Sequence, residues 1–158
     1  MAVRGSFGKA TLDFPRRVRI FCDSDVLIAG SASTTGASYI LLQLSELTLL
    51  DCLTSQYAVH EAERNLLAKL PAAVPAFRLI LEAAVEILPD PPSAVVQHVT
   101  DQAHVKDVPI LAAAIVGEAD FLATFNIRHF RPRKTPPLIL QPSAILSQIR
   151  RSLTHLLN

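Results

Sequence analysis

The sequence predicts an α/β domain, a three-layer α/β/α sandwich around a central, mostly parallel sheet. Short apolar segments of strand length alternate with longer segments whose apolar residues recur at helical spacing. Prolines and glycines separate these segments. Because parallel strands need crossover connections, an alternation of strands and helices places helices on both faces of the sheet.

The first half of the chain alternates strand and helix twice. Pro71 ends the last of these helices, because proline disrupts a helix interior. The expected elements are a strand over 18–22, a helix over 26–47 interrupted at 30–36, a strand over 47–52 and a helix over 55–70.

The second half continues the same pattern. Pro109 suits the first turn of a helix and Gly117 its end. The expected elements are a helix over 76–84, a strand over 85–88, helices over 93–103 and 109–116, strands over 121–125 and 138–140, and an amphipathic helix over 142–156.

Length and composition indicate one domain, since 158 residues with 50% hydrophobic and 18% charged side chains suit a single core. The longest apolar run, 110–116, is too short to cross a membrane. The first residues are basic and lack the features of a secretory signal. We therefore expect a cytoplasmic protein with an N-terminal arm at 1–17 and a folded domain at 18–158.

Cysteines and histidines suggest no zinc site. Cys22 and Cys52 fall in predicted strands, where a free thiol behaves as a small buried hydrophobe. The five histidines are scattered and show no zinc-ligand spacing, so surface or packing roles are expected for them.

Several polar residues are predicted to meet at the carboxyl edge of the sheet, where ligands bind in open parallel sheets. Asp23 follows the first strand directly, with Asp25 two residues later, and Asn126 follows the strand over 121–125. Asp107 precedes a helix, whose N-terminus stabilises an anion. Asp120 precedes its strand and is expected roughly 16 Å from Asn126, at the opposite edge.

Three segments, at 21–28, 55–66 and 107–130, together resemble the PIN-domain nucleases, a fold that includes the toxin ribonucleases of bacterial toxin-antitoxin pairs. The resemblance spans roughly residues 18 to 145. It implies that Asp23, Glu61 and Asp107 are the first three acids of the family's site and that Asn126 stands at the fourth position. Ser24 and Asp25 replace the second and third residues of its Asp-Thr-Asn signature.

Glu61 has a neighbour that periodicity cannot exclude, because Glu63 lies close to the apolar stripe of the same helix. The family's register favours Glu61, and Glu63 remains the alternative.

The resemblance implies a metal-dependent endoribonuclease. Converging carboxylates repel one another unless a cation is present, and oxygen ligands favour Mg²⁺ or Mn²⁺. Such an ion activates a water for attack on an RNA phosphodiester. Asp25 and Thr124 are possible additional contributors. Expected partners are RNA, an antitoxin protein and a second copy of the chain.

A basic run follows Asn126, and its charges suit a phosphate backbone. Phe130, within the run, is expected to be a core anchor. The predicted RNA-binding residues are Arg128, Arg131, Arg133 and Lys134.

Two other interpretations remain open. The segment Asp23-Ser24-Asp25-Val26 also resembles the nucleophile motif of haloacid-dehalogenase phosphatases, in which Asp23 would accept the phosphoryl group. Asn126 in place of an acid also allows a degenerate PIN domain that binds RNA or protein without cleaving.

Overall fold

A single five-stranded sheet organises the protein, described here by a computed structural model that covers residues 16–157. The strands lie in the order β3-β2-β1-β4-β5, and every neighbouring pair is parallel. The predicted parallel sheet is confirmed. The strands are β1 (Arg19–Cys22), β2 (Asp51–Ser55), β3 (Val85–Leu88), β4 (Phe121–Ala123) and β5 (Leu138–Leu140).

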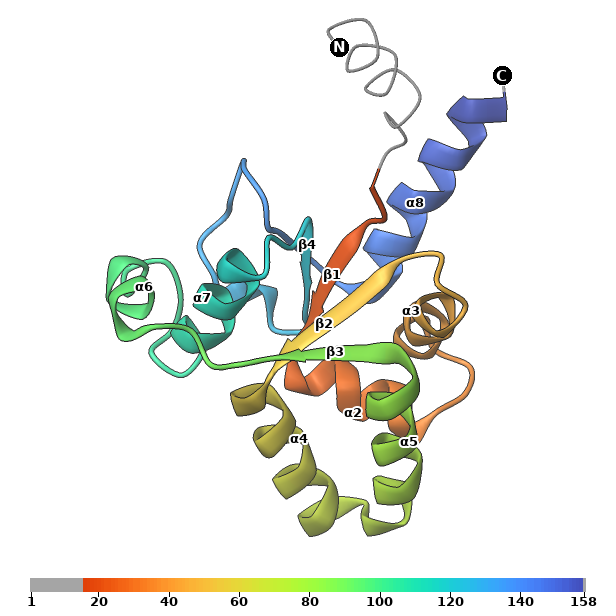
Figure 1. The fold of residues 1–158 in the computed structure, drawn as a ribbon, viewed down its shortest axis with the longest axis horizontal. Helices are drawn as coiled ribbons and strands as arrows, with labels where there is room; N and C mark the ends of the chain where they lie inside the picture. Colours follow the sequence, from red (N-terminus) through yellow and green to blue (C-terminus); the bar gives the residue numbers. More distant parts are fainter. Residues whose placement is uncertain (1–15, 158) are drawn as a thin grey trace, which may run out of the picture.

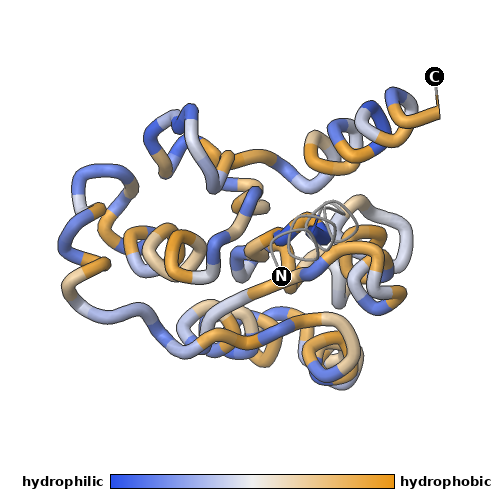
Figure 2. The backbone as a smooth tube through the Cα atoms, turned by 45° about the horizontal axis from the view of Figure 1, so that its top comes forward, coloured by the Kyte–Doolittle hydropathy of each residue, from blue (hydrophilic) through white to orange (hydrophobic). Residues whose placement is uncertain are grey.

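Helices cover both faces of this sheet and form the outer layers (Figure 1). The tube in Figure 2 alternates apolar and polar segments along most helices, as expected for helices with one buried side. The helices are α2 (Ser24–Ala32), α3 (Ala37–Glu46), α4 (Gln56–Lys69), α5 (Val74–Ala84), α6 (Ser93–His98), α7 (Val108–Val116) and α8 (Pro142–Leu157), with short 3-10 turns η1 (Pro71–Ala73) and η2 (Ile127–His129).

Successive side chains of β1 point to opposite faces of the sheet, and the hydrophobic core forms one cluster on each face. Ile20 and Cys22 pack on the face covered by α2, α3, α5 and α8, whereas Phe21 packs on the face covered by α6 and α7. All three side chains are fully buried. The central strand is therefore apolar on both sides, as expected for a parallel sheet covered by two layers.

The helix expected over 26–47 is two helices, α2 and α3, separated by a short loop. A Cβ at Gly30 would overlap the side chain of Leu42, so glycine at this position allows the two helices to approach closely. The predicted interruption at 30–36 is confirmed, although α2 extends to Ala32.

The strand predicted over 47–52 is wrong at its start. Thr48 has a φ of 62°, and its amide donates to the carbonyl of Ser45. This turn follows the end of α3 at Glu46, so the strand β2 begins only at Asp51 and ends at Ser55. The apolar residues at 47–50 suggested a strand because periodicity does not report a turn.

Two further predicted elements are shorter than expected. The helix expected over 93–103 ends at His98, and Ala103 instead forms an isolated antiparallel bridge with Phe130. The strand expected over 121–125 ends at Ala123 because the amide of Phe125 donates to a side chain rather than to a neighbouring strand. The predicted strands at 85–88 and 138–140 are confirmed.

Cys22 and Cys52 are buried free thiols, and Phe130 is buried, as expected. Residues 1–15 of the predicted N-terminal arm lie outside the described residues; Arg16 and Arg17 pair with Asp120 and Asp51. Within residues 16–157, no helix is long and apolar enough to span a bilayer.

Candidate functional site

The candidate site lies at the point in the sheet where the strand order changes direction, between β1 and β4. Strands β2 and β3 are added on one side of β1, and β4 and β5 on the other. The connections that follow β1 and β4 therefore leave the sheet in opposite directions at a switch point, the usual location of ligand sites in open parallel sheets. Asp23 follows β1 and Thr124 follows β4, so both residues stand at this switch point.

Asp23 is the most buried acid of the site, with only 4% of its surface exposed. It is the N-cap of α2: its Oδ1 accepts a 2.7 Å hydrogen bond from the Ser24 amide. Its Oδ2 accepts a 2.9 Å bond from the Thr124 hydroxyl, and its own amide donates to the carbonyl of Ala123. Asp23 is thus fixed by both strands of the switch point.

The protein environment disfavours a negative charge on Asp23. Burial, the charge of Asp25 and the charge of Asp107 raise its pKa to about 7, although the bonds from Thr124 and Ser24 oppose this rise. Burial also raises the pKa of Asp25, to which the charge of Asp107 contributes. These carboxylates are close enough to repel, and a bound cation would relieve that repulsion.

Asp25 binds the loop that follows β4. Its Oδ2 accepts hydrogen bonds from the Phe125 amide at 2.9 Å and the Asn126 side-chain amide at 3.2 Å, and the Thr124 hydroxyl lies 3.4 Å away. Its Oδ1 is buried and has no hydrogen-bond partner. A buried, unpaired carboxylate oxygen is costly, which makes it a natural ligand for a cation.

Glu61 reaches the site from α4 and Glu63 does not. The Ser24 hydroxyl donates a 2.7 Å hydrogen bond to Glu61 Oε1, and Ser24 directly follows Asp23 in the chain. Glu63 instead pairs with Arg78 of α5 at 2.8 Å. Helix α4 is placed for this role by Ser55, whose side chain caps it. The geometry favours the family register over the alternative glutamate.

Asp107 precedes α7, and its charge contributes to the raised pKa values of Asp23 and Asp25. Its Oδ2 lies 2.9 Å from Nδ1 of His129. His129 also stacks on His104, with ring centroids 4.3 Å apart. The expectation that the histidines are scattered is therefore wrong for these two, which the loop before α7 and the turn after β4 bring together.

Asp120 lies at the other edge of the sheet, as its position before β4 predicted. Both of its carboxylate oxygens bind the Arg16 guanidinium, and Oδ2 also accepts from the Arg19 amide at 2.8 Å. These contacts hold the start of β1, so Asp120 is a structural residue at the amino edge.

The basic segment after Asn126 divides into two kinds of side chain. The Arg133 guanidinium is partly buried and donates to the Gln102 side chain and to the carbonyls of Pro136 and Pro137. The other three cations, Arg128, Arg131 and Lys134, are exposed.

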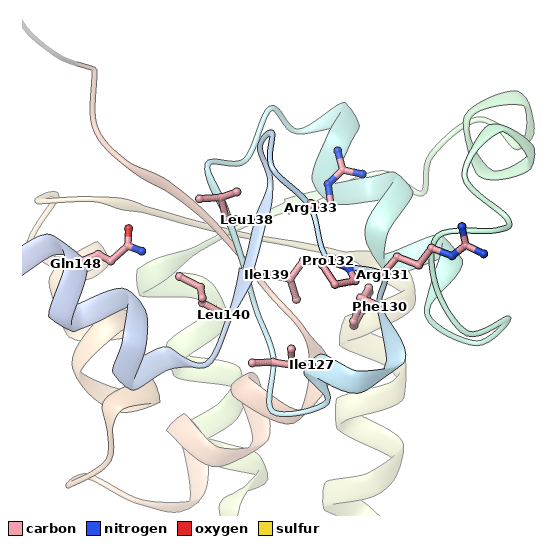
Figure 3. Close-up of a pocket in the computed structure, with 9 residues that line it drawn as sticks. All are labelled: Ile127, Phe130, Arg131, Pro132, Arg133, Leu138, Ile139, Leu140 and Gln148. Atoms are coloured by element: carbon pink, nitrogen blue, oxygen red, sulfur yellow. The ribbon is translucent and has the colours of Figure 1, made fainter.

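A pocket of about 250 Å³ lies beside this segment, against β5 (Figure 3). Ile127, Ile139 and Leu140 contribute apolar side chains to it, while the guanidinium groups of Arg131 and Arg133 point away from its apolar centre (Figure 3). The pocket is therefore suited to an apolar group, and the exposed cations beside it remain free to face a polyanion.

The donor set at the switch point fits a hard divalent cation. Asp23, Asp25, Glu61 and Asp107 supply oxygen atoms only, and one of these oxygens is buried without a partner. Mg²⁺ and Mn²⁺ prefer such ligands.

Comparisons with known proteins identify the architecture. No family model matches the sequence, and no curated protein matches it. Among solved structures, VapBC2 from Rickettsia felis, determined bound to a DNA fragment from their promoter, aligns with a TM-score of 0.62 at 14% identity, covering 78% of this chain and 98% of that one.

Two further structures are similar. PAE2754 from Pyrobaculum aerophilum aligns with a TM-score of 0.57 at 19% identity, covering 89% of this chain and 96% of that one. VapC20 from Mycobacterium tuberculosis, a Sarcin-Ricin loop cleaving toxin, aligns with a TM-score of 0.50 at 17% identity, covering 68% and 89%. The predicted α/β/α fold is confirmed by this shared architecture.

Proposed function

We propose that this chain, which has a PIN-like fold shared with VapC toxins, is a divalent-metal-dependent endoribonuclease. The observation that carries the proposal is the placement of three carboxylates around the start of α2: the Thr124 hydroxyl contacts both Asp23 and Asp25, and the Ser24 hydroxyl donates to Glu61. Two of them have raised pKa values, and one oxygen is buried without a partner. These features destabilise the metal-free protein, and a bound cation would remove that cost.

The metal ligands in this proposal are Asp23, Glu61 and Asp107, with Asp25 as an additional carboxylate. When bound there, Mg²⁺ or Mn²⁺ supplies an activated water and neutralises the charge that develops on the scissile phosphate. Hydrolysis then needs no covalent bond to the protein.

The protein's own contribution is to hold these groups in place. Ser24 donates to Glu61 and Thr124 donates to Asp23, so each hydroxyl fixes one carboxylate in orientation. Asn126, held by Asp25 at the exposed end of the loop, can donate a hydrogen bond to a phosphate oxygen. Fixed groups of this kind stabilise developing charge without reorganising during the reaction.

RNA is the proposed substrate because exposed cations stand next to this centre. Arg128 lies in η2, two residues after Asn126, with Arg131 and Lys134 following in the same segment. Lys and Arg contacts to phosphates bind a chain without reading its sequence.

The proposal extends to the biological setting. Two similar structures are a VapBC2 complex and a toxin, so we propose that this chain is the toxin of a toxin-antitoxin pair, inhibited by an antitoxin protein in the cytoplasm. We also propose a homodimer. Helix α8 offers a surface for it, because Leu153, Leu156 and Leu157 are exposed.

A phosphatase that uses Asp23 as a nucleophile agrees less well with the geometry. Both oxygens of Asp23 accept hydrogen bonds, from Ser24 and Thr124, and the side chain is almost wholly buried. Attack on a phosphate by either oxygen would therefore require the loss of one of these hydrogen bonds. Absence of a trapped phospho-aspartate at Asp23 is therefore expected.

The deciding experiment is cleavage of a mixed-sequence RNA by the chelator-treated chain, with and without added Mn²⁺. Cleavage should require Mn²⁺, stop on adding chelator and disappear in Asp23→Asn. Tight RNA binding without any metal-supported cleavage would instead identify a degenerate domain that binds RNA, and would reject the enzymatic proposal.

A further inference from the structure

We propose that His104, Asp107 and His129 form a separate metal site that takes Zn²⁺ and thereby withdraws Asp107 from the nuclease centre. The inhibitory part rests on the proposed function. Zinc binding itself does not, because it depends only on these three side chains.

The three donor atoms are already close together. One ligand atom from each residue lies within 4.8 Å of the other two, and Oδ2 of Asp107 lies 2.9 Å from Nδ1 of His129. Tetrahedral zinc with bonds of about 2.0–2.1 Å places its ligands about 3.4 Å apart. The Asp107 and His129 atoms meet this requirement closely, and His104 needs to approach by at most about 1.4 Å. Its side chain is exposed, and because its ring stacks on that of His129, metal binding requires the His104 ring to rotate out of the stack.

Backbone hydrogen bonds fix the relative positions of all three residues. The amide of His104 donates to the carbonyl of His129 at 2.7 Å, and the amide of Asp107 donates to the carbonyl of His104 at 2.8 Å. The bridge between Ala103 and Phe130 extends this pairing. Metal binding therefore orders side chains on a backbone that folding has already ordered, which lowers its entropic cost.

The ligand chemistry selects zinc over the ions proposed for the nuclease centre. Two imidazoles and one carboxylate are a usual three-residue set for Zn²⁺, whereas Mg²⁺ prefers oxygen ligands alone. His104 also stands at the exposed rim, where an ion can enter from solvent.

Asp107 couples the two sites. It is a proposed ligand of the nuclease centre, and its Oδ2 lies 2.9 Å from Nδ1 of His129. A carboxylate oriented by zinc and His129 is a poorer ligand for Mg²⁺ or Mn²⁺ at the centre. Zinc should therefore act as an inhibitor at concentrations that saturate this site.

Titration calorimetry of the chelator-treated full chain with Zn²⁺ tests the site directly. We expect a saturable zinc ion at the histidines, besides any ion that the carboxylates of the switch point take up. Its affinity should fall by about tenfold or more in His104→Asn and similarly in His129→Asn. The matched control is His98→Asn, another exposed histidine, at the end of α6, which should bind zinc as the natural chain does. Because His104 is exposed, its variant is expected to fold, and a thermal melt checks this. Unchanged affinity in folded His104→Asn, or no saturable binding at all, overturns the proposal.

The regulatory part is tested by adding Zn²⁺ to Mn²⁺-supported cleavage. The natural chain and His98→Asn should be inhibited over the range in which zinc binds, and His104→Asn should need about tenfold more zinc. Equal inhibition of His104→Asn and the natural chain would overturn this part. If zinc binds through the histidines but Mn²⁺ supports no cleavage, the zinc site stands and the proposed nuclease function fails.

Discussion

The side-chain amide of Asn126 donates a 3.2 Å hydrogen bond to the carboxylate of Asp25. Both residues depart from the PIN-domain pattern in charge, because that pattern has an amide at 25 and an acid at 126. The structure shows that the departures touch. The negative charge that the pattern has at position 126 is thus present at Asp25, which is hydrogen-bonded to Asn126.

This contact predicts that the two positions are coupled. Asn126→Asp places two carboxylates in contact and should destabilise the metal-free protein by roughly 1–3 kcal/mol, because like charges repel. The exchange Asp25→Asn with Asn126→Asp restores an amide opposite a carboxylate and should recover most of that loss. Chemical denaturation of both single variants and the double variant measures the coupling. Additive effects of the two substitutions would show that the residues act independently.

Metal stoichiometry should respond to the same substitution. Asn126 is neutral, and Oδ2 of Asp25 already accepts hydrogen bonds from Phe125 and Asn126. Mn²⁺ titration calorimetry of the natural chain should therefore show one ion bound much more tightly than any other. Asn126→Asp adds a carboxylate and should strengthen a second site. Two equally tight sites in the natural chain, or no gain in the variant, would contradict this prediction. Because the histidine cluster could take up Mn²⁺, His104→Asn serves as the background for a repeat titration.

Removal of any proposed ligand should abolish cleavage. Asp23→Asn, Glu61→Gln and Asp107→Asn should each lower kcat by about a hundredfold or more, because each removes a metal-binding oxygen. Glu63→Gln is the matched control for Glu61: it loses only an ion pair with Arg78, whose side chain is mostly exposed. If Glu63→Gln abolishes cleavage and Glu61→Gln does not, the ligand assignment on α4 is wrong.

Asp120→Asn should affect stability rather than catalysis. Asp120 accepts three hydrogen bonds from Arg16 and Arg19 at the amino edge of the sheet, so its loss should cost about 1 kcal/mol of folding free energy. Cleavage by the folded variant should be close to that of the natural chain. A loss of kcat as large as that of Asp107→Asn would show that the two edges of the sheet are not functionally distinct.

The stability of the metal-free protein should fall as pH rises. Burial and the charge of Asp25 raise the pKa of Asp23 from 3.8 to about 7, so the folded state holds this proton more tightly than the unfolded state does. The resulting stability is fully present below about pH 4 and is lost as pH rises through 7, by roughly 2–4 kcal/mol. Thermal melts in chelator at pH 5 and pH 8 measure this loss.

Asp23→Asn is the control for this pH dependence, because an amide does not titrate. The variant should lose much of the difference between the two pH values, and added Mn²⁺ should reduce the difference in the natural chain. An Asp23→Asn variant with the full pH dependence would place the responsible group elsewhere.

The sequence predicts the position of a residue where that position depends only on the strand or helix next to it. An acid directly after an alternating apolar strand stands at the carboxyl end of that strand, which predicts the position of Asp23. An acid directly before a strand stands at the other edge, which predicts the position of Asp120. Glu61 was a harder case. Helical periodicity could not separate it from Glu63, and only the family register favoured it; the bond from Ser24 agrees with that register.

The histidine cluster was missed because it depends on a contact between two loops. His104 and His129 are 25 positions apart, and a bridge between Ala103 and Phe130 brings them together. No hydrophobic period reports such a bridge. The available sequence signal was weak: His104 lies three residues before Asp107 at the start of a helix. The turn at 47–50 has a local cause instead: the positive φ at Thr48 leaves no signal in a mostly apolar segment.

The basic segment gives the last prediction, because the structure divides four cations that look equivalent in the sequence. Arg128, Arg131 and Lys134 are exposed, so replacing all three by alanine should weaken RNA binding and raise KM with little change in stability. For single-stranded RNA, the slope of log affinity against log salt should fall by about 2, since each lost phosphate contact removes about 0.7. Arg150→Ala with Arg151→Ala, two exposed cations of α8, is the control and should leave the slope unchanged.

Arg133→Ala should behave in the opposite way. Its guanidinium donates to Gln102, Pro136 and Pro137, so its removal leaves partly buried acceptors unpaired and should cost about 1–3 kcal/mol of stability. RNA affinity of the folded variant at low temperature should fall less than that of the triple variant. Thermal melts and a salt series of RNA binding, measured on both variants, decide between the two roles. If Arg133→Ala lowers the salt slope without lowering the melting temperature, its guanidinium binds phosphate rather than supporting the loop, and the division drawn from its hydrogen bonds is wrong.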